Sequence, residues 1–533
     1  MKKNSFLEGA FIATLAIFIT KFLGIIYVIP FNKIIGNTGG ALYGYAYNIY
    51  NLFLIISCSG LPLAISKLTS EYNTLKEDSK KEYLFYIATK IIGIFSIVSF
   101  LICFLFSKVI ATLIIGNMTG GNTIDDVSFV IKCVSFAILI VPMLSISRGY
   151  MQGHRYMSAP AISQIIEQVA RIIVLLLGSY TILKLFPGHL TEAVGISVFA
   201  AFVGAVLAYI YLNIKLKVIR NKDIEINLED TEKKEVTKKL IKYAIPFIVI
   251  NIANSLYTTI DMILVIKGLN ILGFKAVDIE TISGIFTTWG IKINTIITSF
   301  ATGIALSLIP NISREKARND LKEVNNKFNK TIILFFYIIL PLSIFMSIFG
   351  STIWNIFYGY NEYGVQIIKY SLLVAGIDAL YIMISNALQG MNKTKLIYTS
   401  VLTGLIANAI LDIPLMLLFS KLNIYPYYGA ITATLIGYLI SIIIPLVSLK
   451  KKDNFNYEDI KKILPKLLGT YTILIIICIY YNSLIKNITN RIIDIFLLMF
   501  IGIICLLIYY LFNKKEINAI IKKDKKDTGD IDD

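Results

Sequence analysis

Nine ionisable side chains stand within long apolar stretches of the sequence, where a charge is costly unless it meets a partner, a polar cavity or a ligand. They are Lys21, Lys132, Glu167, Arg171, Asp261, Lys292, Lys369, Asp378 and Asp412. Lys21 and Lys292 each lie near the middle of their stretch. Two cations that face one cavity would suit an anionic, phosphorylated substrate, whereas a cavity for a cationic drug should be acidic.

Asp261 is the acid that competes most directly for Lys292. A buried ammonium without an anion would lose its proton, so each lysine needs an acid or a substrate phosphate nearby. We expect Asp261 and Lys292 to pair in the resting protein and the substrate to displace this pair. Lys21, Lys292 and Asp261 are therefore the predicted substrate-binding residues of the cavity.

A second group of charges belongs to the segment 141–172, around which the chain is organised. Arg148 ends one apolar run, a short basic turn follows, and the next run carries Glu167 and Arg171. Glu167 and Arg171 are four residues apart with the acid nearer the N-terminus, the better orientation for pairing on a helix. We interpret Arg148, Glu167 and Arg171 as a structural or gating ion pair. Upstream, a face rich in tyrosine and asparagine over 43–51 either lines a polar cavity or forms an interfacial belt.

Residues for other kinds of chemistry are missing from the sequence. Its two histidines, His154 and His189, lie in predicted loops without metal-ligand neighbours, and neither a GxxxxGK[ST] nor a GxSxG motif occurs. The five cysteines stand in apolar runs with no CxxC spacing, which favours packing. We predict no catalytic residues, no metal site and no cofactor.

The elements that must position these residues are membrane helices. Hydrophobic residues make up 56% of the 533 residues, charged residues 16%, and the mean hydropathy is +0.72. Apolar stretches of about 20 residues match the hydrocarbon thickness of a bilayer. The sequence predicts an all-α polytopic membrane protein with fourteen transmembrane helices, the first of them over 7–32 and the eighth over 283–312.

The net charge of +17 is explained by topology rather than by nucleic-acid binding. Most of the 51 Lys and Arg residues fall in the segments that are cytoplasmic if the N-terminus is inside. This asymmetry follows the positive-inside rule and predicts a multi-pass protein of the cell membrane with both termini in the cytoplasm. The basic surface would also attract anionic membrane lipids.

Two related turns indicate a chain built in two similar halves. Residues 148–154 read RGYMQGH, and residues 385–393 read SNALQGMNK in a corresponding place. We predict a six-helix lobe over 1–242 that ends in a cytoplasmic linker, a second six-helix lobe over 243–450, and two appended helices with a basic tail over 451–533. Such repeats are typical of secondary transporters, whose substrate sites lie near the bilayer midplane.

Four motifs carry a resemblance to a known family. They are VIPFNKIIGNTGGAL (28–42), GLPLAISK (60–67), RGYMQGH (148–154) and SQIIEQVARI (163–172). Together they resemble the polysaccharide-transport branch of the multidrug/oligosaccharidyl-lipid/polysaccharide exporter superfamily. Within it, the chain is most similar to the MurJ-type lipid II flippases of Gram-positive bacteria and to stage V sporulation protein B.

The resemblance implies a substrate and some roles. It implies that an undecaprenyl-pyrophosphate-linked peptidoglycan precursor, lipid II, crosses from the inner to the outer leaflet by alternating access. It implies that Lys21 and Lys292 meet the pyrophosphate and that the two appended helices, predicted over 467–485 and 492–512, line a groove for the lipid tail. The Gram-negative branch has further arginines late in the first helix and in the second, which is predicted over 43–66; this chain has Tyr27-Val28 and Ile56-Ser57-Cys58 there.

Several alternatives stay open at this point. One is a flippase for another polysaccharide lipid or for sporulation, and another is a multidrug antiporter of the same superfamily, against which the cations Lys21 and Lys292 argue. A polyprenyl-phosphate glycosyltransferase would need a metal-binding acidic motif on an extended loop, which the sequence lacks. A purely structural sporulation membrane protein is a further alternative. Coupling to an ion or to the membrane potential is also open.

Overall fold

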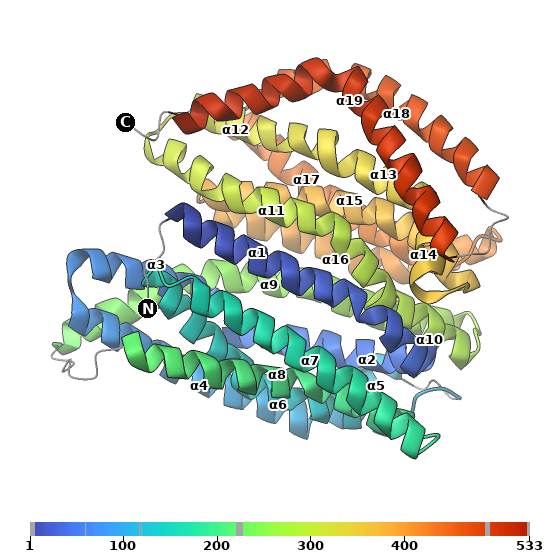
Figure 1. Cartoon of the computed structure of the whole chain (residues 1–533), viewed down its shortest axis with the longest axis horizontal. Coiled ribbons are helices and arrows are strands. Elements are labelled where there is room, and N and C mark those ends of the chain that lie inside the picture. The colour runs from blue at the N-terminus through green and yellow to red at the C-terminus, as the bar shows by residue number, and fades with distance from the viewer. Residues whose placement is uncertain are drawn as a thin grey trace. The chain divides into compact units, whose positions relative to one another are not determined.

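The computed structural model describes residues 6–58, 60–116, 118, 120–219, 228–485 and 491–529, and every regular element in these ranges is a helix (Figure 1). The all-α prediction is thereby confirmed. The elements are α1 (Phe6–Ile26), α2 (Val28–Cys58), α3 (Leu61–Leu75), α4 (Asp78–Leu105), α5 (Ser107–Ile115), α6 (Ile124–Gly153), α7 (Ser158–Leu185), α8 (Leu190–Ile219), α9 (Asp230–Ile271), α10 (Ala276–Gly284), η1 (Ile285–Trp289), α11 (Gly290–Ala317), α12 (Leu321–Leu334), η2 (Phe335–Ile339), α13 (Leu340–Ile348), α14 (Gly350–Tyr358), α15 (Glu362–Gly390), α16 (Thr394–Lys421), α17 (Tyr427–Lys452), α18 (Glu458–Ile485) and α19 (Arg491–Gly529).

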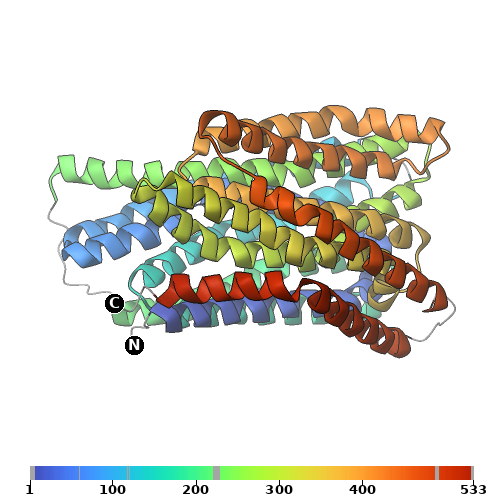
Figure 2. The same ribbon diagram turned by 90° about the horizontal axis from the view of Figure 1, so that it is seen from above.

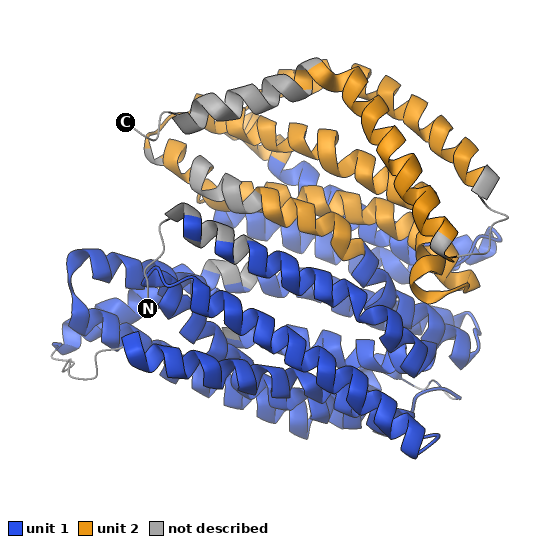
Figure 3. Cartoon of the chain, in the orientation of Figure 1, with its two compact units in different colours: residues 1–293, 393–445 blue, residues 294–392, 446–533 orange. Residues whose placement is uncertain are grey.

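These helices form two compact units (Figure 3). Unit 1 comprises Met1–Ile293 and Lys393–Pro445, and unit 2 comprises Asn294–Asn392 and Leu446–Asp533. The boundaries of the units fall inside α11, in the turn between α15 and α16, and inside α17, rather than at residues 242 and 450. The division into two six-helix lobes therefore stays a prediction. Residues 220–227 of the predicted linker lie outside the described residues.

Most of the predicted membrane spans are present as long apolar helices, whose length is plain in a second view (Figure 2). By length and composition, twelve helices among the described residues could cross a membrane. Of the two remaining predicted spans, 7–32 corresponds to α1 with the first turns of α2, and 283–312 corresponds to η1 with α11. The count of fourteen stays a prediction. The number of long apolar helices shows that the chain is a multi-pass membrane protein.

The helix predicted over 7–32 is divided in the structure. α1 ends at Ile26, Tyr27 stands at the break, and α2 is itself kinked at Gly36, whose φ of 64° lies in the left-handed region that glycine adopts most easily. Beyond the kink, a Cβ atom on Gly40 would overlap the indole of Trp289, and the Thr288 hydroxyl donates to the Gly40 carbonyl at 2.8 Å. The small residues of α2 therefore let η1 pack directly on its backbone.

The glycines of the RGYMQGH motif serve a similar purpose on α6. A Cβ atom on Gly149 would overlap the backbone carbonyl of Pro62, and one on Gly153 would lie 2.6 Å from the carbonyl oxygen of Ser66. Both carbonyls belong to α3, so two glycines four residues apart let α6 approach α3 closely. Small residues at this spacing are the usual means of close helix contact in membranes.

Replacing Gly149 by alanine will lower the melting temperature of the detergent-purified protein. The new methyl group would meet backbone, which cannot move aside as a side chain can, and overpacking of this kind costs about 1–3 kcal/mol. The matched control is Gly469→Ala on α18, where no atom lies within 4 Å of the added Cβ. Alanine favours helix over glycine, so the control should melt at the same or a slightly higher temperature. Equal melting temperatures for both variants would contradict the close α3–α6 contact.

Candidate functional site

Arg171 is held by tyrosine hydroxyls in unit 1. From α7 its guanidinium donates to Tyr47 Oη at 3.0 Å and to Tyr43 Oη at 2.9 Å, and it also lies 4.8 Å from the centroid of the Tyr47 ring. The two tyrosine rings of α2 are stacked, with centroids 5.5 Å apart. The ion pairs found among the described residues do not include Arg171, whose side chain is half-buried.

Lys292 belongs to the same aromatic surroundings. Its Nζ lies 5.7 Å from the centroid of the Tyr27 ring, within the range of a cation–π interaction. Lys292 and Arg171 both lie close enough to the Tyr47 hydroxyl to act on it electrostatically. Phe31 joins the group, since its ring packs edge-on against Tyr43 at 5.2 Å. The tyrosine face of α2 therefore lines a polar cluster that contains two cations.

Lys21 is half-buried on α1, which packs along α7. One turn further on, a Cβ atom on Gly24 would lie 3.6 Å from the amide nitrogen of Gln168. Gly204 of α8 brings α7 close from another side, because a Cβ there would meet the Glu167 carbonyl oxygen and Arg171 Cβ. Gly204 thus lets α8 pack directly on the backbone of the α7 segment that carries the charged residues.

The ion pair in this segment differs from the one we expected. Glu167 Oε2 accepts from Arg148 Nη2 at 2.8 Å, and Arg148 Nε donates to Ser163 Oγ at 2.8 Å. The pair therefore joins α6 to α7, and Arg171 takes no part in it. Glu167 and Arg171, four residues apart on α7, therefore have different partners. Glu167 binds Arg148 of α6, which is also held by Ser163, and Arg171 binds the tyrosines of α2.

Losing Glu167 alone should be worse than losing it together with its partner. Glu167→Gln strands the Arg148 charge, which costs 3–5 kcal/mol in a fully buried site and about 2 kcal/mol here, where both side chains keep some exposure. Adding Arg148→Met should restore part of the folded yield, measured by size-exclusion chromatography. The double variant Glu167→Gln with Arg171→Leu is the control and should not recover. Recovery in the control instead would point to Arg171 as the partner.

Asp261 has partners other than Lys292. Its carboxylate accepts from Asn408 Nδ2 at 2.7 Å and from Thr434 Oγ1 at 3.0 Å, so α9, α16 and α17 meet there. The described ion pairs do not join Asp261 to Lys292, so the expected resting pair is not the arrangement found. Asp412 follows Asn408 by one helical turn, is fully buried and lies near enough to Asp261 for the charge of Asp261 to act on it.

The Asp412 carboxylate is unusual in this setting. Neither of its oxygens has a hydrogen-bond partner among the described residues, and the amide oxygen of Asn408 lacks one as well. Two neighbouring buried carboxylates repel each other unless a proton or a metal cation lies with them. Carboxylate, amide and hydroxyl oxygens are the donors that hard cations prefer. Groups of three or more His, Cys, Asp or Glu side chains suited to a metal do not occur in the part of the chain that the structure describes.

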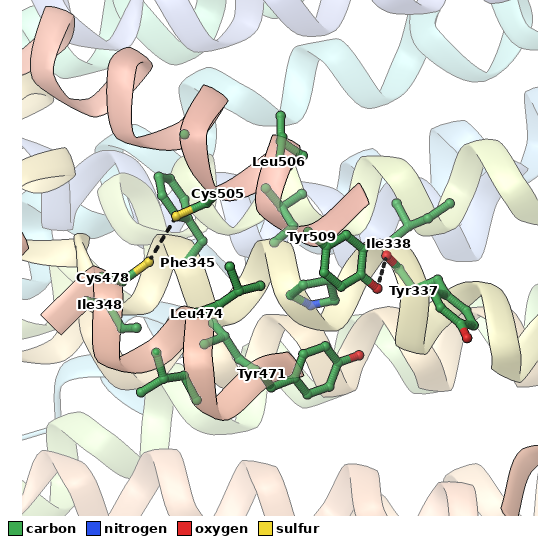
Figure 4. A pocket seen from close by; sticks show the side chains of 15 residues that line it. Tyr337, Ile338, Phe345, Ile348, Tyr471, Leu474, Cys478, Cys505, Leu506 and Tyr509 are labelled. Atoms are coloured by element: carbon green, nitrogen blue, oxygen red, sulfur yellow. Dashed lines mark hydrogen bonds between the residues drawn. The ribbon is translucent and has the colours of Figure 1, made fainter. Parts of the chain in front are cut away.

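Unit 2 contains an apolar cavity of about 320 Å³ between η2–α13 on one side and α18–α19 on the other (Figure 4). The lining includes Pro341, Phe345, Leu474 and Leu506. Of the tyrosine hydroxyls at its wall, those of Tyr471 and Tyr509 donate to backbone carbonyls, whereas that of Tyr337 has no hydrogen-bond partner among the described residues. Pro341 has no N–H to offer the carbonyl of residue 337 four positions before it, and the Tyr509 hydroxyl donates to that carbonyl at 3.0 Å. The cavity therefore presents mainly hydrocarbon.

Residues 6–314 match the family model described as polysaccharide biosynthesis protein, and residues 246–413 match the MatE model. Lipid II flippase MurJ of Bacillus subtilis (strain 168) is 33% identical over 472 residues, which cover 86% of this chain and 85% of the relative. Stage V sporulation protein B of the same organism is 24% identical over 336 residues, 63% of each chain.

Solved structures show the same fold at lower identity. A lipid II flippase MurJ in an inward closed conformation aligns with a TM-score of 0.65 at 17% identity, over 95% of this chain and 99% of that chain. An inward-facing multidrug resistance MATE family transporter aligns with a TM-score of 0.62 at 15% identity, over 81% of this chain and 95% of that chain.

Proposed function

The chain belongs to the polysaccharide biosynthesis protein family, and we propose that it is a lipid II flippase. It moves the undecaprenyl-pyrophosphate-linked peptidoglycan precursor from the inner to the outer leaflet by alternating access. The observation that carries the proposal is the pair of cations, Arg171 and Lys292, that share the tyrosine cluster of unit 1. The 33% identity to a relative that bears this name supports the same substrate.

The two cations suit a pyrophosphate for chemical reasons. Neither is found in an ion pair among the described residues, so a dianionic group would not need to displace a resident carboxylate. The guanidinium binds phosphate oxygens through paired N–H donors, and the ammonium acts as a point charge. We place Lys21 in the same role from α1. A cationic drug would be repelled by this cluster, so the proposal favours a lipid pyrophosphate over a multidrug antiporter.

The other two features fit the same function. The apolar cavity of unit 2 holds part of the polyprenyl tail, because its wall offers hydrocarbon contact and almost no free polar group. The Asp261–Asp412 pair binds the coupling cation, a proton or a metal ion, rather than the substrate as we first expected for Asp261. The transport step requires neither a catalytic residue nor a cofactor.

The test is a strain depleted of its lipid II flippase. Expression of this chain should restore growth and should return lipid-linked precursor to the outer leaflet, measured by a reagent that reaches only that leaflet. If the chain accumulates in the membrane while the precursor stays inside, the proposed substrate is wrong. Restoration of sporulation alone would indicate the sporulation-specific function.

The orientation in the membrane is part of the proposal. A cysteine in place of Pro187, an exposed residue in the α7–α8 turn, should react with an impermeant thiol reagent added to intact cells. A cysteine in place of Lys322, exposed at the start of α12, should react only after the membrane is opened. The reverse pattern would place both termini outside and would contradict the topology that the lysine distribution predicts.

A further inference from the structure

A groove of about 740 Å³ follows the first turns of α9, on the N-terminal side of the apolar residues 246–250. Tyr83 of α4 forms its other side. The groove is lined by Tyr83, Asp230, Lys233, Lys234, Thr237, Lys238, Ile241, Lys242 and Ile245. It lies entirely within unit 1 and shares no residue with the cation cluster or with the Asp261–Asp412 pair.

Three lysines form one stripe along this groove. Lys234, Lys238 and Lys242 are spaced by four residues, so they lie on the same face of α9, and all three are exposed. The ion pairs found among the described residues include none of the three. Three like charges at this spacing repel one another, which is unfavourable without an anion to neutralise them.

Two neighbouring lysines of α9, in contrast, already form ion pairs with acidic residues of the protein. Lys233 pairs with Asp230 at 3.2 Å. Lys239, on another face, pairs with Glu235 at 3.1 Å, and this hydrogen bond raises the pKa of Lys239 above its usual range. The three lysines of the stripe therefore differ from the other lysines near the start of α9, whose charges are neutralised by acidic residues of the protein.

Apolar side chains continue the stripe toward the membrane. Ile241 and Ile245 line the groove, and their side chains are 43% and 49% exposed. The groove therefore presents an apolar surface directly beside the three lysines. Ile245 is followed directly by the apolar residues 246–250, so it lies where the apolar stretch of this segment begins. Tyr83 stands near the start of the apolar helix α4, where tyrosine is frequent at the headgroup level.

We propose that this groove binds the headgroup of an anionic phospholipid from the adjoining leaflet. The phosphate lies among Lys234, Lys238 and Lys242, and the first carbons of the acyl chains cover Ile241 and Ile245. A soluble anion would use the lysines but would leave both isoleucines in water. The inference needs only that the chain is embedded in a membrane, so it does not depend on what the chain transports.

The experiment compares lipid retention by the full-length protein in detergent, using native mass spectrometry with phosphatidylglycerol and phosphatidylcholine. The wild-type protein should retain phosphatidylglycerol in preference. Replacing Lys234, Lys238 and Lys242 by glutamine should reduce this preference at least tenfold, since each lysine near a surface phosphate contributes a several-fold effect. The matched control replaces the exposed run 450–452 on α17 by glutamine and removes the same charge.

The control should retain phosphatidylglycerol as the wild type does, and an equal loss in both triple variants would overturn the proposal. The variant Ile241→Ser with Ile245→Ser separates lipid from soluble anion. It should bind phosphatidylglycerol more weakly, and inorganic pyrophosphate should not compete with the lipid. Competition by pyrophosphate without an effect of the isoleucines would instead assign the lysines to a soluble anion. If the triple variant does not fold, Lys238→Gln alone should still show a several-fold loss.

Discussion

Lys292→Met and Arg171→Met will each abolish complementation of a flippase-depleted strain, although both variants accumulate in the membrane. A charged hydrogen bond to a phosphate contributes about 1.5–3 kcal/mol, so the loss of either cation should slow transport by about 10- to 100-fold. Lys292→Arg should keep part of the activity, because charge matters more than shape. Likewise, Lys21→Arg should keep part of the activity, and Lys21→Met should abolish complementation.

Arg171 should tolerate its conservative change less well than Lys292 does. A lysine at 171 keeps the charge but cannot donate from two fixed directions to Tyr43 and Tyr47. The control is Lys132→Met on α6, which removes an exposed cation from another apolar helix and should complement fully. If the methionine variants at 171 and 292 also complement fully, the two cations have a structural role, and the proposed substrate would depend on similarity to relatives alone.

Asp261→Asn and Asp412→Asn will each remove the dependence of transport on an ion gradient. Two neighbouring carboxylates need a cation between them, whereas one carboxylate beside an amide does not, so the neutral variants would no longer bind and release the coupling ion. The measurement is precursor transport in proteoliposomes with an imposed sodium or proton gradient. We expect at least a tenfold lower gradient-driven rate.

The stability of the same variants separates coupling from folding. Because the Asp412 oxygens have no hydrogen-bond partner among the described residues, Asp412→Asn should leave the melting temperature unchanged or raise it. Asp261→Asn should lower it, since Asn408 and Thr434 both donate to that carboxylate. An Asp412→Asn variant that follows the gradient as the wild type does would contradict the coupling role.

The sequence was sufficient for the fold class because hydrocarbon thickness imposes the length and the composition of each span. It also located the charged residues that lie within the long helices of the structure. It was not sufficient for their partners. The four-residue spacing of Glu167 and Arg171 is a local signal, while the true partners of Arg171 on α2 are 124 and 128 residues away in the sequence.

Such distant pairings depend on how helices are rotated and how closely they approach. Gly204 lets α8 meet α7 at the Glu167 carbonyl, and this contact helps to direct Arg171 toward the tyrosines. One signal was available, because the tyrosine face over 43–51 was consistent with a polar cavity. The same limit applies to Asp412, whose relation to Asp261 requires α9 and α16 to be neighbours.

The close contact of η1 with α2 has a consequence for spectroscopy. The chain contains two tryptophans, Trp289 and Trp354, and both indoles are buried. With Trp354→Phe, all indole emission would arise from Trp289 against Gly40. Separation of η1 from α2 would admit water to the indole and shift its emission to longer wavelength. A single substitution thus converts this helix contact into an optical reporter that follows transport in real time without an attached dye.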